Sequence, residues 1–294
     1  IILISNLEHH SNTVPWQMLC ERSGASLEVI PVTEDGSIDL EAFHRLLDAH
    51  QGTLKLVALT HVSNAFGTIL PVESMIKEAH RAGSLVLIDG AQAVPHLPVD
   101  VQKLDADFYV FSGHKVYAPT GIGVLYGKRA LLDSLPPWRG GGEMIQKVSY
   151  DGTTYNDLPY KYEAGTPNIE GAIALAAALE FLHDLGSEAL LNHEHAIIRQ
   201  AASALSSING LMLYGPEDRS GALSFNIEGI HHYDLGTLLD KMGIAIRTGH
   251  HCCQPLMSRF GMTGTLRASF ACFNDTSDVQ RLVESVEKGS AMLR

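Results

Sequence analysis

Short apolar runs alternate with amphipathic stretches through the first half of the chain, and each run stops abruptly at polar residues. Continuous apolar runs are typical of strands that are covered on both faces, as in a parallel sheet. This alternation favours an α/β fold in which helices joined by right-handed crossovers sandwich a mostly parallel sheet. The pattern predicts a helix over residues 72–82 and strands over residues 54–59, 85–88, 108–111 and 123–126.

The second half of the chain has a different pattern. Gly186 is predicted as the C′ residue of an alanine-rich helix over residues 169–183, and Ser187 as the N-cap of a helix that runs to about residue 205. We therefore predict a large domain over residues 1–184 and a small C-terminal α+β domain over residues 185–294. The remaining predicted elements are helices over residues 235–242 and from 278, and strands over residues 223–227, 244–247 and 266–273.

The composition indicates a globular protein and argues against some classes of binding partner. The 294 residues are 45% apolar and 18% charged, with a net charge of −12. This acidic balance argues against non-specific binding to nucleic acid or anionic membranes, and no apolar run approaches the ~20 residues of a membrane span. Residues 1–4 are too short for a signal-peptide core and are interpreted as a strand entered midway. The scattered cysteines suit thiols in a reducing compartment, so we expect a cytoplasmic enzyme.

Two of the apolar runs are followed by residues of the kinds that a pyridoxal cofactor requires. Asp89 ends one run, and Lys115 follows another in the segment Ser-Gly-His-Lys. Ligands of parallel sheets bind beyond the carboxyl ends of the strands, where a lysine can form a Schiff base and a carboxylate can pair with the ring nitrogen. Gln92 is placed to donate to the phenolic oxygen, and Ser112 and His114 offer donors to the phosphate. A lone lysine there is more often solvated, but a carboxylate that ends an apolar run needs a cationic partner.

The segment Arg247-Thr-Gly-His-His-Cys252-Cys253 offers two kinds of chemistry. A zinc site is one interpretation, although adjacent side chains splay apart and structural zinc sites use spaced pairs. A reactive thiol fits better, because a neighbouring arginine or protonated histidine lowers the pKa of a cysteine from about 8.5. A structural role stays open for Cys253, and we predict no metal site.

Two further candidates lie at the ends of predicted strands. The segment Glu8-His9-His10 follows the first strand, where a histidine can stack on a flat ring and move protons. A metal site is the alternative there, but two adjacent histidines seldom bind one ion without further ligands. Arg267 opens the last strand, and either grips a substrate carboxylate with its planar fork or forms a surface salt bridge.

Taken in order, these segments resemble those of the cysteine desulfurases, PLP enzymes of the class V aminotransferase superfamily with the type I PLP-transferase fold. The similarity is greatest to the SufS-type (group II) branch, which includes the selenocysteine lyases. The RTGHHC segment separates this branch from the other, whose catalytic cysteine lies in a longer mobile loop. The motifs in register are EHHSN (8–12), THVSN (60–64), DGAQ (89–92), SGHK (112–115), EAGTPN (163–168), RTGHHC (247–252) and RAS (267–269).

The resemblance implies a role for each candidate residue. Lys115 would hold pyridoxal 5′-phosphate, while Asp89 pairs with the ring nitrogen and Gln92 touches the phenolate. The other implied roles are ring stacking by His9, phosphate binding by Ser112 and His114, contact with the phosphate of the neighbouring subunit's cofactor by Thr166, cofactor or substrate-carboxylate binding by Asn64, Arg247 and Arg267, and persulfide formation by Cys252.

The same resemblance implies a homodimer that converts L-cysteine, with L-selenocysteine as a further candidate substrate, to L-alanine. Lys115 would take the Cα proton, and the Cys252 thiolate would attack the substrate sulfur and hold it as a persulfide. A SufE-like acceptor protein would then receive the sulfur for iron–sulfur cluster assembly.

Two alternatives stay open beside this interpretation. A kynureninase-like enzyme of the same superfamily would keep Asp89 and Lys115 but would need no thiol at Cys252. Members of the family also have a segment before the point where this chain starts, with a Gly/Thr-rich turn that binds the cofactor phosphate. We therefore expect either a fragment or a missing part carried by another chain, and the second alternative is a truncated, non-catalytic partner chain.

Overall fold

The structure, a computed structural model, describes residues 1–294 and is built around a six-stranded sheet with the order β2-β1-β3-β4-β5-β6. Strands β1 to β5 run parallel to one another, and β6 runs antiparallel to β5. The predicted mostly parallel sheet is therefore confirmed, with one reversed strand at its edge. The strands are β1 (Ile2–Ser5), β2 (Leu27–Ile30), β3 (Leu56–Thr60), β4 (Leu85–Asp89), β5 (Phe108–Ser112) and β6 (Gly123–Gly127).

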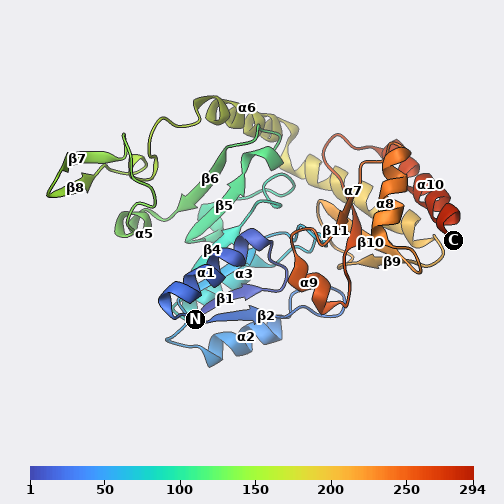
Figure 1. The fold of residues 1–294 in the computed structure, drawn as a ribbon, viewed down its shortest axis with the longest axis horizontal. Helices are drawn as coiled ribbons and strands as arrows, with labels where there is room; N and C mark the ends of the chain where they lie inside the picture. The colour runs from blue at the N-terminus through green and yellow to red at the C-terminus, as the bar shows by residue number, and fades with distance from the viewer.

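Helices cover both faces of this sheet (Figure 1). Successive strand residues point to opposite faces, so Leu3 and Val57 enter a core with α2 and α3, whereas Ile2 and Ile4 pack towards Trp16 of α1. Burial on both faces explains why these strands are apolar throughout. The helices are α1 (Val14–Ser23), α2 (Leu40–Ala49), α3 (Val72–Arg81), α4 (Val101–Leu104) and α5 (Arg129–Ser134), with short 3-10 turns η1 (His10–Asn12), η2 (Gly113–Lys115) and η3 (Tyr160–Tyr162).

A second, four-stranded antiparallel sheet with the order β11-β12-β10-β9 forms a smaller unit. Helices α7, α8 and α10 pack with this sheet around a second apolar core, as predicted for an α+β unit. The elements of this half are α6 (Ile169–Leu185), α7 (Ser187–Ser206), β9 (Leu211–Tyr214), β10 (Ala222–Ile227), α8 (His232–Lys241), β11 (Arg247–Gly249), α9 (Gln254–Arg259), β12 (Thr265–Ser269) and α10 (Thr276–Leu293).

Three local predictions in this half are wrong. Gly186 is the residue that precedes the first turn of α7, so Ser187 lies inside the helix and is not its N-cap. Strand β11 starts only at Arg247, because residues 244 and 246 contact the second core without pairing in the sheet. Strand β12 stops at Ser269, because residues 270, 271 and 273 leave the sheet and line a cavity.

A short segment of the C-terminal half forms one of the contacts between the two units. Cys253, Leu256 and Met257, at the start of α9, are buried in the core of the six-stranded sheet, although the rest of that core comes from residues 3–109. The segment that carries Cys252 is therefore attached to the large unit. The division of the chain near residue 184 stays a prediction.

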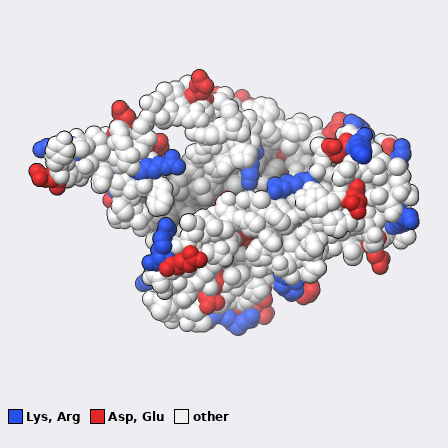
Figure 2. All heavy atoms as spheres, in the orientation of Figure 1, with Lys and Arg blue, Asp and Glu red and all other residues white.

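An arm and one helix expose large apolar side chains. Strands β7 (Ile145–Ser149) and β8 (Gly152–Tyr155) form a hairpin that projects away from both sheets (Figure 1). Val148, Tyr150 and Tyr155 of this arm are exposed, as are Ile169 and Ile173 of α6. Apolar surface of this extent is typical of an interaction site. Acidic and basic side chains are interspersed on the face in Figure 2 and form no continuous patch of one sign.

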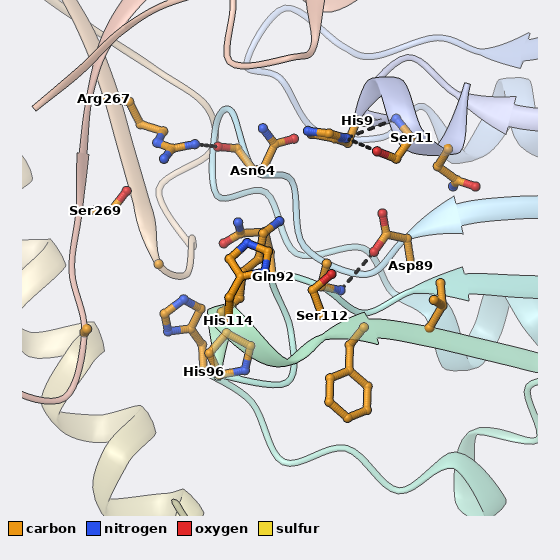
Figure 3. Close-up of a pocket in the computed structure, with 18 of the residues that line it drawn as sticks. His9, Ser11, Asn64, Asp89, Gln92, His96, Ser112, His114, Arg267 and Ser269 are labelled. Carbon is orange, nitrogen blue, oxygen red and sulfur yellow. Dashed lines mark hydrogen bonds between the residues drawn. The ribbon is translucent and has the colours of Figure 1, made fainter. Parts of the chain in front are cut away.

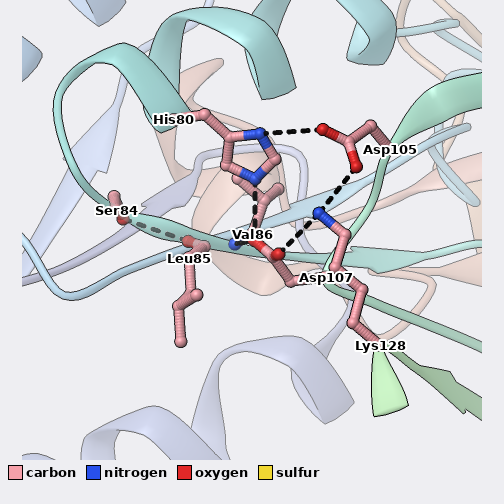
Figure 4. Close-up of polar contacts among 7 residues, drawn as sticks. All are labelled: His80, Ser84, Leu85, Val86, Asp105, Asp107 and Lys128. Atoms are coloured by element: carbon pink, nitrogen blue, oxygen red, sulfur yellow. Dashed lines mark hydrogen bonds and ion pairs between the residues drawn. The ribbon is translucent and has the colours of Figure 1, made fainter. Parts of the chain in front are cut away.

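A polar cluster fixes the amino-terminal edge of the large sheet (Figure 4). The ring of His80 lies 2.8 Å from Asp107, and the Lys128 amine lies 2.7 Å from Asp105 and 2.9 Å from Asp107. Asp107 also accepts the amide hydrogen of Val86 at 2.7 Å, and the hydrogen bond from Lys128 lowers the pKa of Asp105. These groups therefore satisfy one another at this edge of the sheet.

Candidate active site

A cavity of about 820 Å³ opens at the carboxyl edge of the large sheet (Figure 3). Its walls come from both units, because the ends of β4 and β5 face residues of β11 and β12 across it. The parallel topology thus brings together segments that lie far apart in the chain. The predicted site residues that line the cavity are His9, Asn64, Asp89, Gln92, Ser112, His114, Lys115, Arg247 and Arg267.

Asp89 is the last residue of β4, and it lines the cavity. Its Oδ1 accepts a hydrogen bond from the amide of Ala91 at 2.9 Å. Burial raises the pKa of Asp89, while the Ala91 hydrogen bond and the charge of Lys115 act in the opposite direction. A half-buried carboxylate of this kind is stabilised by a cationic partner, which a protonated pyridine ring would supply.

Lys115 ends the turn η2, directly after β5, and its side chain is half-buried. Burial lowers the pKa of Lys115; the carboxylate of Asp89 opposes this shift, and the charges of Arg267 and Arg247 add to it. A lowered pKa increases the fraction of unprotonated amine, which is the form that attacks a carbonyl group.

The turn after Asp89 is shaped by a tyrosine. A Cβ atom on Gly90 would lie 2.0 Å from the ring of Tyr109, so only glycine fits between the two. The Tyr109 hydroxyl lies 2.9 Å from Nδ1 of the buried His61, whose amide donates to the carbonyl oxygen of Asp89 at 2.9 Å. The position of Asp89 is therefore fixed from β3 and β5 as well as from its own strand.

His9 follows β1 and lines the cavity with a neutral ring. Burial lowers the pKa of His9 to about 4, with smaller effects from Lys115, His10 and the two arginines. Its Nδ1 accepts the amide hydrogen of Ser11 at 3.0 Å, which places the proton of the neutral ring on Nε2. A neutral, half-buried imidazole is suited to stack on a flat ring.

Arg247 and Arg267 face each other as paired residues of β11 and β12. Arg267 donates to the carbonyl oxygen of Asn64 at 2.6 Å, and its Nε is buried without a partner. Burial, with the charge of Arg247, lowers the pKa of Arg267 to about 10. Since no carboxylate of the chain pairs with either guanidinium, the arrangement favours an external anion over a salt bridge.

Cys252 lies in a tight loop beside this arginine pair. Its Sγ is 3.4 Å from a guanidinium nitrogen of Arg247, and the side chain is half-buried. His251 and Cys252 have φ values of 54° and 56°, in the left-handed region that non-glycine residues rarely adopt. Cys253 is fully buried, and burial raises the pKa of its thiol.

Two of the predicted site residues lie outside the cavity lining. Cys252 sits beside the wall formed by Arg247. Thr166 is exposed in the segment before α6 and does not line the cavity. The roles of all the site residues stay predictions.

Sequence reasoning missed several residues of the cavity wall. Asn12 and Ser269 belong to the motifs EHHSN and RAS, and His96 lies in the loop that follows Asp89. Trp16 had no such signal, because α1 carries a weak amphipathic pattern and was not predicted.

The donor set of the cavity fits PLP. The amine of Lys115 matches the cofactor aldehyde, and the half-buried acid of Asp89 matches the ring nitrogen. The two guanidinium groups, which have no carboxylate partner in the chain, match anionic groups. No group of three or more His, Cys, Asp or Glu side chains is arranged so that it could hold a metal ion. No helix combines the length and the apolar character that a membrane crossing requires.

Comparisons with known proteins identify the family. Residues 1–282 match the family described as aminotransferase class-V. A probable cysteine desulfurase of Vibrio cholerae is 51% identical over 99% of this chain and 72% of its own length. A cysteine desulfurase of Escherichia coli is 52% identical over 98% of this chain and 70% of its own length.

Solved structures agree with the sequence relatives. The crystal structure of the Escherichia coli cysteine desulfurase CsdA covers 100% of this chain and 72% of its own, with a TM-score of 0.95 and 44% identity. The cysteine desulfurase of Thermococcus onnurineus covers 98% of this chain and 72% of its own, with a TM-score of 0.93 and 39% identity. The chain therefore belongs to the class-V aminotransferases, a family of PLP-dependent enzymes, and within that family to the cysteine desulfurases.

Proposed function

We propose that this protein converts L-cysteine to L-alanine and holds the released sulfur as a persulfide on Cys252. The observation that carries the proposal is that one cavity combines Lys115, Asp89 and an arginine pair, and that Arg247 of this pair contacts the Cys252 thiol. Each part matches a requirement of the reaction: cofactor attachment, ring protonation, substrate binding and sulfur capture.

The cofactor would be held by Lys115, Asp89, Gln92, His9, Ser112 and His114. When bound, PLP supplies an electron sink that makes the Cα hydrogen of an amino acid acidic. The half-buried carboxylate of Asp89 would keep a proton on the ring nitrogen, and the neutral ring of His9 offers a stacking surface. The Lys115 amine, with its lowered pKa, accepts the Cα proton.

The substrate carboxylate would be bound by Arg267 and Arg247, with Asn64 beside them. The Cys252 thiolate then attacks the substrate sulfur. A sulfur–sulfur bond forms as the Cβ–sulfur bond breaks, and the bonding electron pair stays with the carbon skeleton, which becomes alanine after protonation.

The assembly and partners of the enzyme belong to the same proposal. We infer a cytoplasmic homodimer, supported by the exposed apolar side chains of the β7–β8 arm and of α6. Thr166, exposed just before α6, would reach the phosphate bound to the second subunit. A SufE-like acceptor would receive the sulfur for iron–sulfur cluster assembly, and L-selenocysteine would be a second substrate. We also propose the division into domains 1–184 and 185–294.

Borohydride reduction of the PLP-loaded protein, followed by peptide mass mapping, tests the cofactor assignment. The reduced cofactor should be fixed on Lys115. Its recovery on another lysine would overturn the assignment, and a colourless protein that gains no mass would favour the non-catalytic partner chain.

Replacement of the nucleophile tests the reaction. Cys252→Ser should bind PLP normally but release sulfide from L-cysteine at least about a hundredfold more slowly. Full activity of Cys252→Ser would instead favour a kynureninase-like enzyme. Cys20→Ser, a substitution at a half-buried thiol of α1 outside the cavity lining, is the matched control.

A further inference from the structure

Three hydrogen bonds join residues 8–10, which follow β1, to the loop that carries Cys252. The amide of His10 donates to the carbonyl oxygen of Cys252 at 2.8 Å. The amide of Gln254 donates to Nε2 of His10 at 3.1 Å. The thiol of Cys253 donates to the carbonyl oxygen of Glu8 at 3.3 Å. Residues 8–10 therefore contact the loop at Cys252 and at the two residues that follow it.

Residues 8–10 are themselves held in place by the side chain of Glu8, which is buried. Its carboxylate accepts hydrogen bonds from the Ser5 hydroxyl at 2.5 Å, the Asn12 amide group at 2.6 Å and the Thr60 backbone amide at 3.0 Å. These bonds tie the segment to the ends of β1 and β3 and to η1. The loop is thus joined to a rigid part of the sheet.

The nucleophile loop needs such support because its backbone is strained. His251 and Cys252 both have positive φ values, and a non-glycine residue persists in this region only when its surroundings hold it there. Asn64 offsets part of this strain by donating to the carbonyl oxygen of His251 at 2.5 Å. Together these bonds hold the loop in the conformation in which the Cys252 thiol contacts Arg247.

We propose that His10 is a positioning residue for Cys252, which acts by accepting the amide hydrogen of Gln254 and so holds the nucleophile loop in its strained conformation. The inference rests on the proposed function, in which Cys252 is the sulfur acceptor. Nε2 of His10 accepts a hydrogen only when it carries no proton. Burial and the neighbouring His250 lower the pKa of His10, which keeps this ring neutral.

Cys253 also holds the nucleophile loop in place. Its side chain lies in the core of the large unit, directly beside the half-buried Cys252. Its thiol donates to the carbonyl oxygens of Glu8 at 3.3 Å and Leu7 at 3.6 Å. Of the two adjacent cysteines, one is thus an anchor in the core and the other is presented at the site.

His10→Leu and His10→Gln in the PLP-loaded protein test the proposal. Leucine removes the acceptor, whereas the amide oxygen of glutamine can take the place of Nε2. We expect His10→Leu to lower kcat for L-cysteine about tenfold with KM changed by less than about twofold, because only the position of the nucleophile changes. The cofactor absorbance should stay the same, and the amide of Gln254 should exchange hydrogen about tenfold faster. His10→Gln should restore both values.

The controls separate this inference from the proposed function. His183→Leu makes the same substitution at an exposed residue of α6 and should leave kcat and exchange unchanged. Wild-type kcat and wild-type exchange at Gln254 in His10→Leu would overturn the positioning role, as would a His10→Gln variant as impaired as His10→Leu. Full activity of Cys252→Ser would overturn the proposed function alone. The exchange rate at Gln254 reports on its hydrogen bond to His10 and needs no turnover.

Discussion

His96 Nδ1 and Glu194 Oε2 lie 2.7 Å apart, and both side chains are buried. His96 comes from the loop after β4 and lines the cavity, while Glu194 lies in α7 of the smaller unit. The ring of His96 also packs so closely on Gly221 that a Cβ atom there would lie 2.5 Å from Nε2. The pair thus links the two units beside the cavity.

We predict that His96→Ala lowers the free energy of unfolding by about 3 kcal/mol, because it leaves the Glu194 carboxylate buried without its partner. Urea denaturation of the variants measures the effect. The double variant His96→Ala/Glu194→Leu should recover part of the loss, since it removes the unpaired charge. Arg45→Ala, which breaks an exposed pair with Glu41 at 4.0 Å, should change the free energy by less than about 1 kcal/mol.

Gly90→Ala should weaken cofactor binding as well as stability. The added Cβ atom would lie 2.0 Å from the Tyr109 ring, so the turn that carries Asp89 must move. We expect a loss of about 1–3 kcal/mol in unfolding free energy and a higher Kd for PLP in a fluorescence titration. Gly140→Ala is the matched control, because a Cβ atom there meets nothing within 4 Å. Equal behaviour of the two variants would contradict the role of the Tyr109 contact.

Stability should fall with rising pH through the titration of Glu8. Burial raises the pKa of Glu8 from 4.5 to about 7, against hydrogen bonds from Ser5, Thr60 and Asn12. The folded protein therefore binds a proton that the unfolded chain has lost, so this contribution is present below pH 4.5 and disappears as the pH rises through about 7.

We predict that the difference in unfolding free energy between the wild type and Glu8→Gln changes by up to about 3 kcal/mol between about pH 5 and pH 8, in the direction of a weaker wild type. Denaturation curves at several pH values measure this difference. The same substitution at the exposed Glu21 of α1 is the matched control. A constant difference for Glu8→Gln would show that Glu8 titrates normally.

The sequence predicted the sheet and the cavity residues better than the side-chain contacts that hold those residues in place. Lys115 and Asp89 were recognisable because each follows an apolar run, and strand topology alone then brings them to one edge. The partnership of His61 with Tyr109 joins residues 48 positions apart, and that of His96 with Glu194 joins residues 98 positions apart. Contacts between residues so far apart leave no recognisable pattern in the sequence around either residue.

Local backbone geometry limited the prediction in the second half. The apolar residues 244 and 246 alternate like those of a strand, yet they contact the core outside the sheet. Positive φ values at His251 and Cys252 were also unpredictable, since neither residue type favours this region. The strain at Cys252 depends on tertiary hydrogen bonds from His10 and Asn64, and these exist only in the folded chain.

Arg267→Lys should raise KM for L-cysteine by about tenfold or more, because an ammonium group cannot replace the planar fork that grips a carboxylate. Cysteamine, which is cysteine without the carboxylate, isolates this effect: its binding should be equally weak in the wild type and in Arg267→Lys. Arg199→Lys, at an exposed position on α7, should leave both ligands unaffected. Binding is measured from the change in cofactor absorbance during titration. If Arg267→Lys weakens cysteamine and cysteine alike, Arg267 supports the cavity wall through its 2.6 Å bond to Asn64 and does not bind the carboxylate.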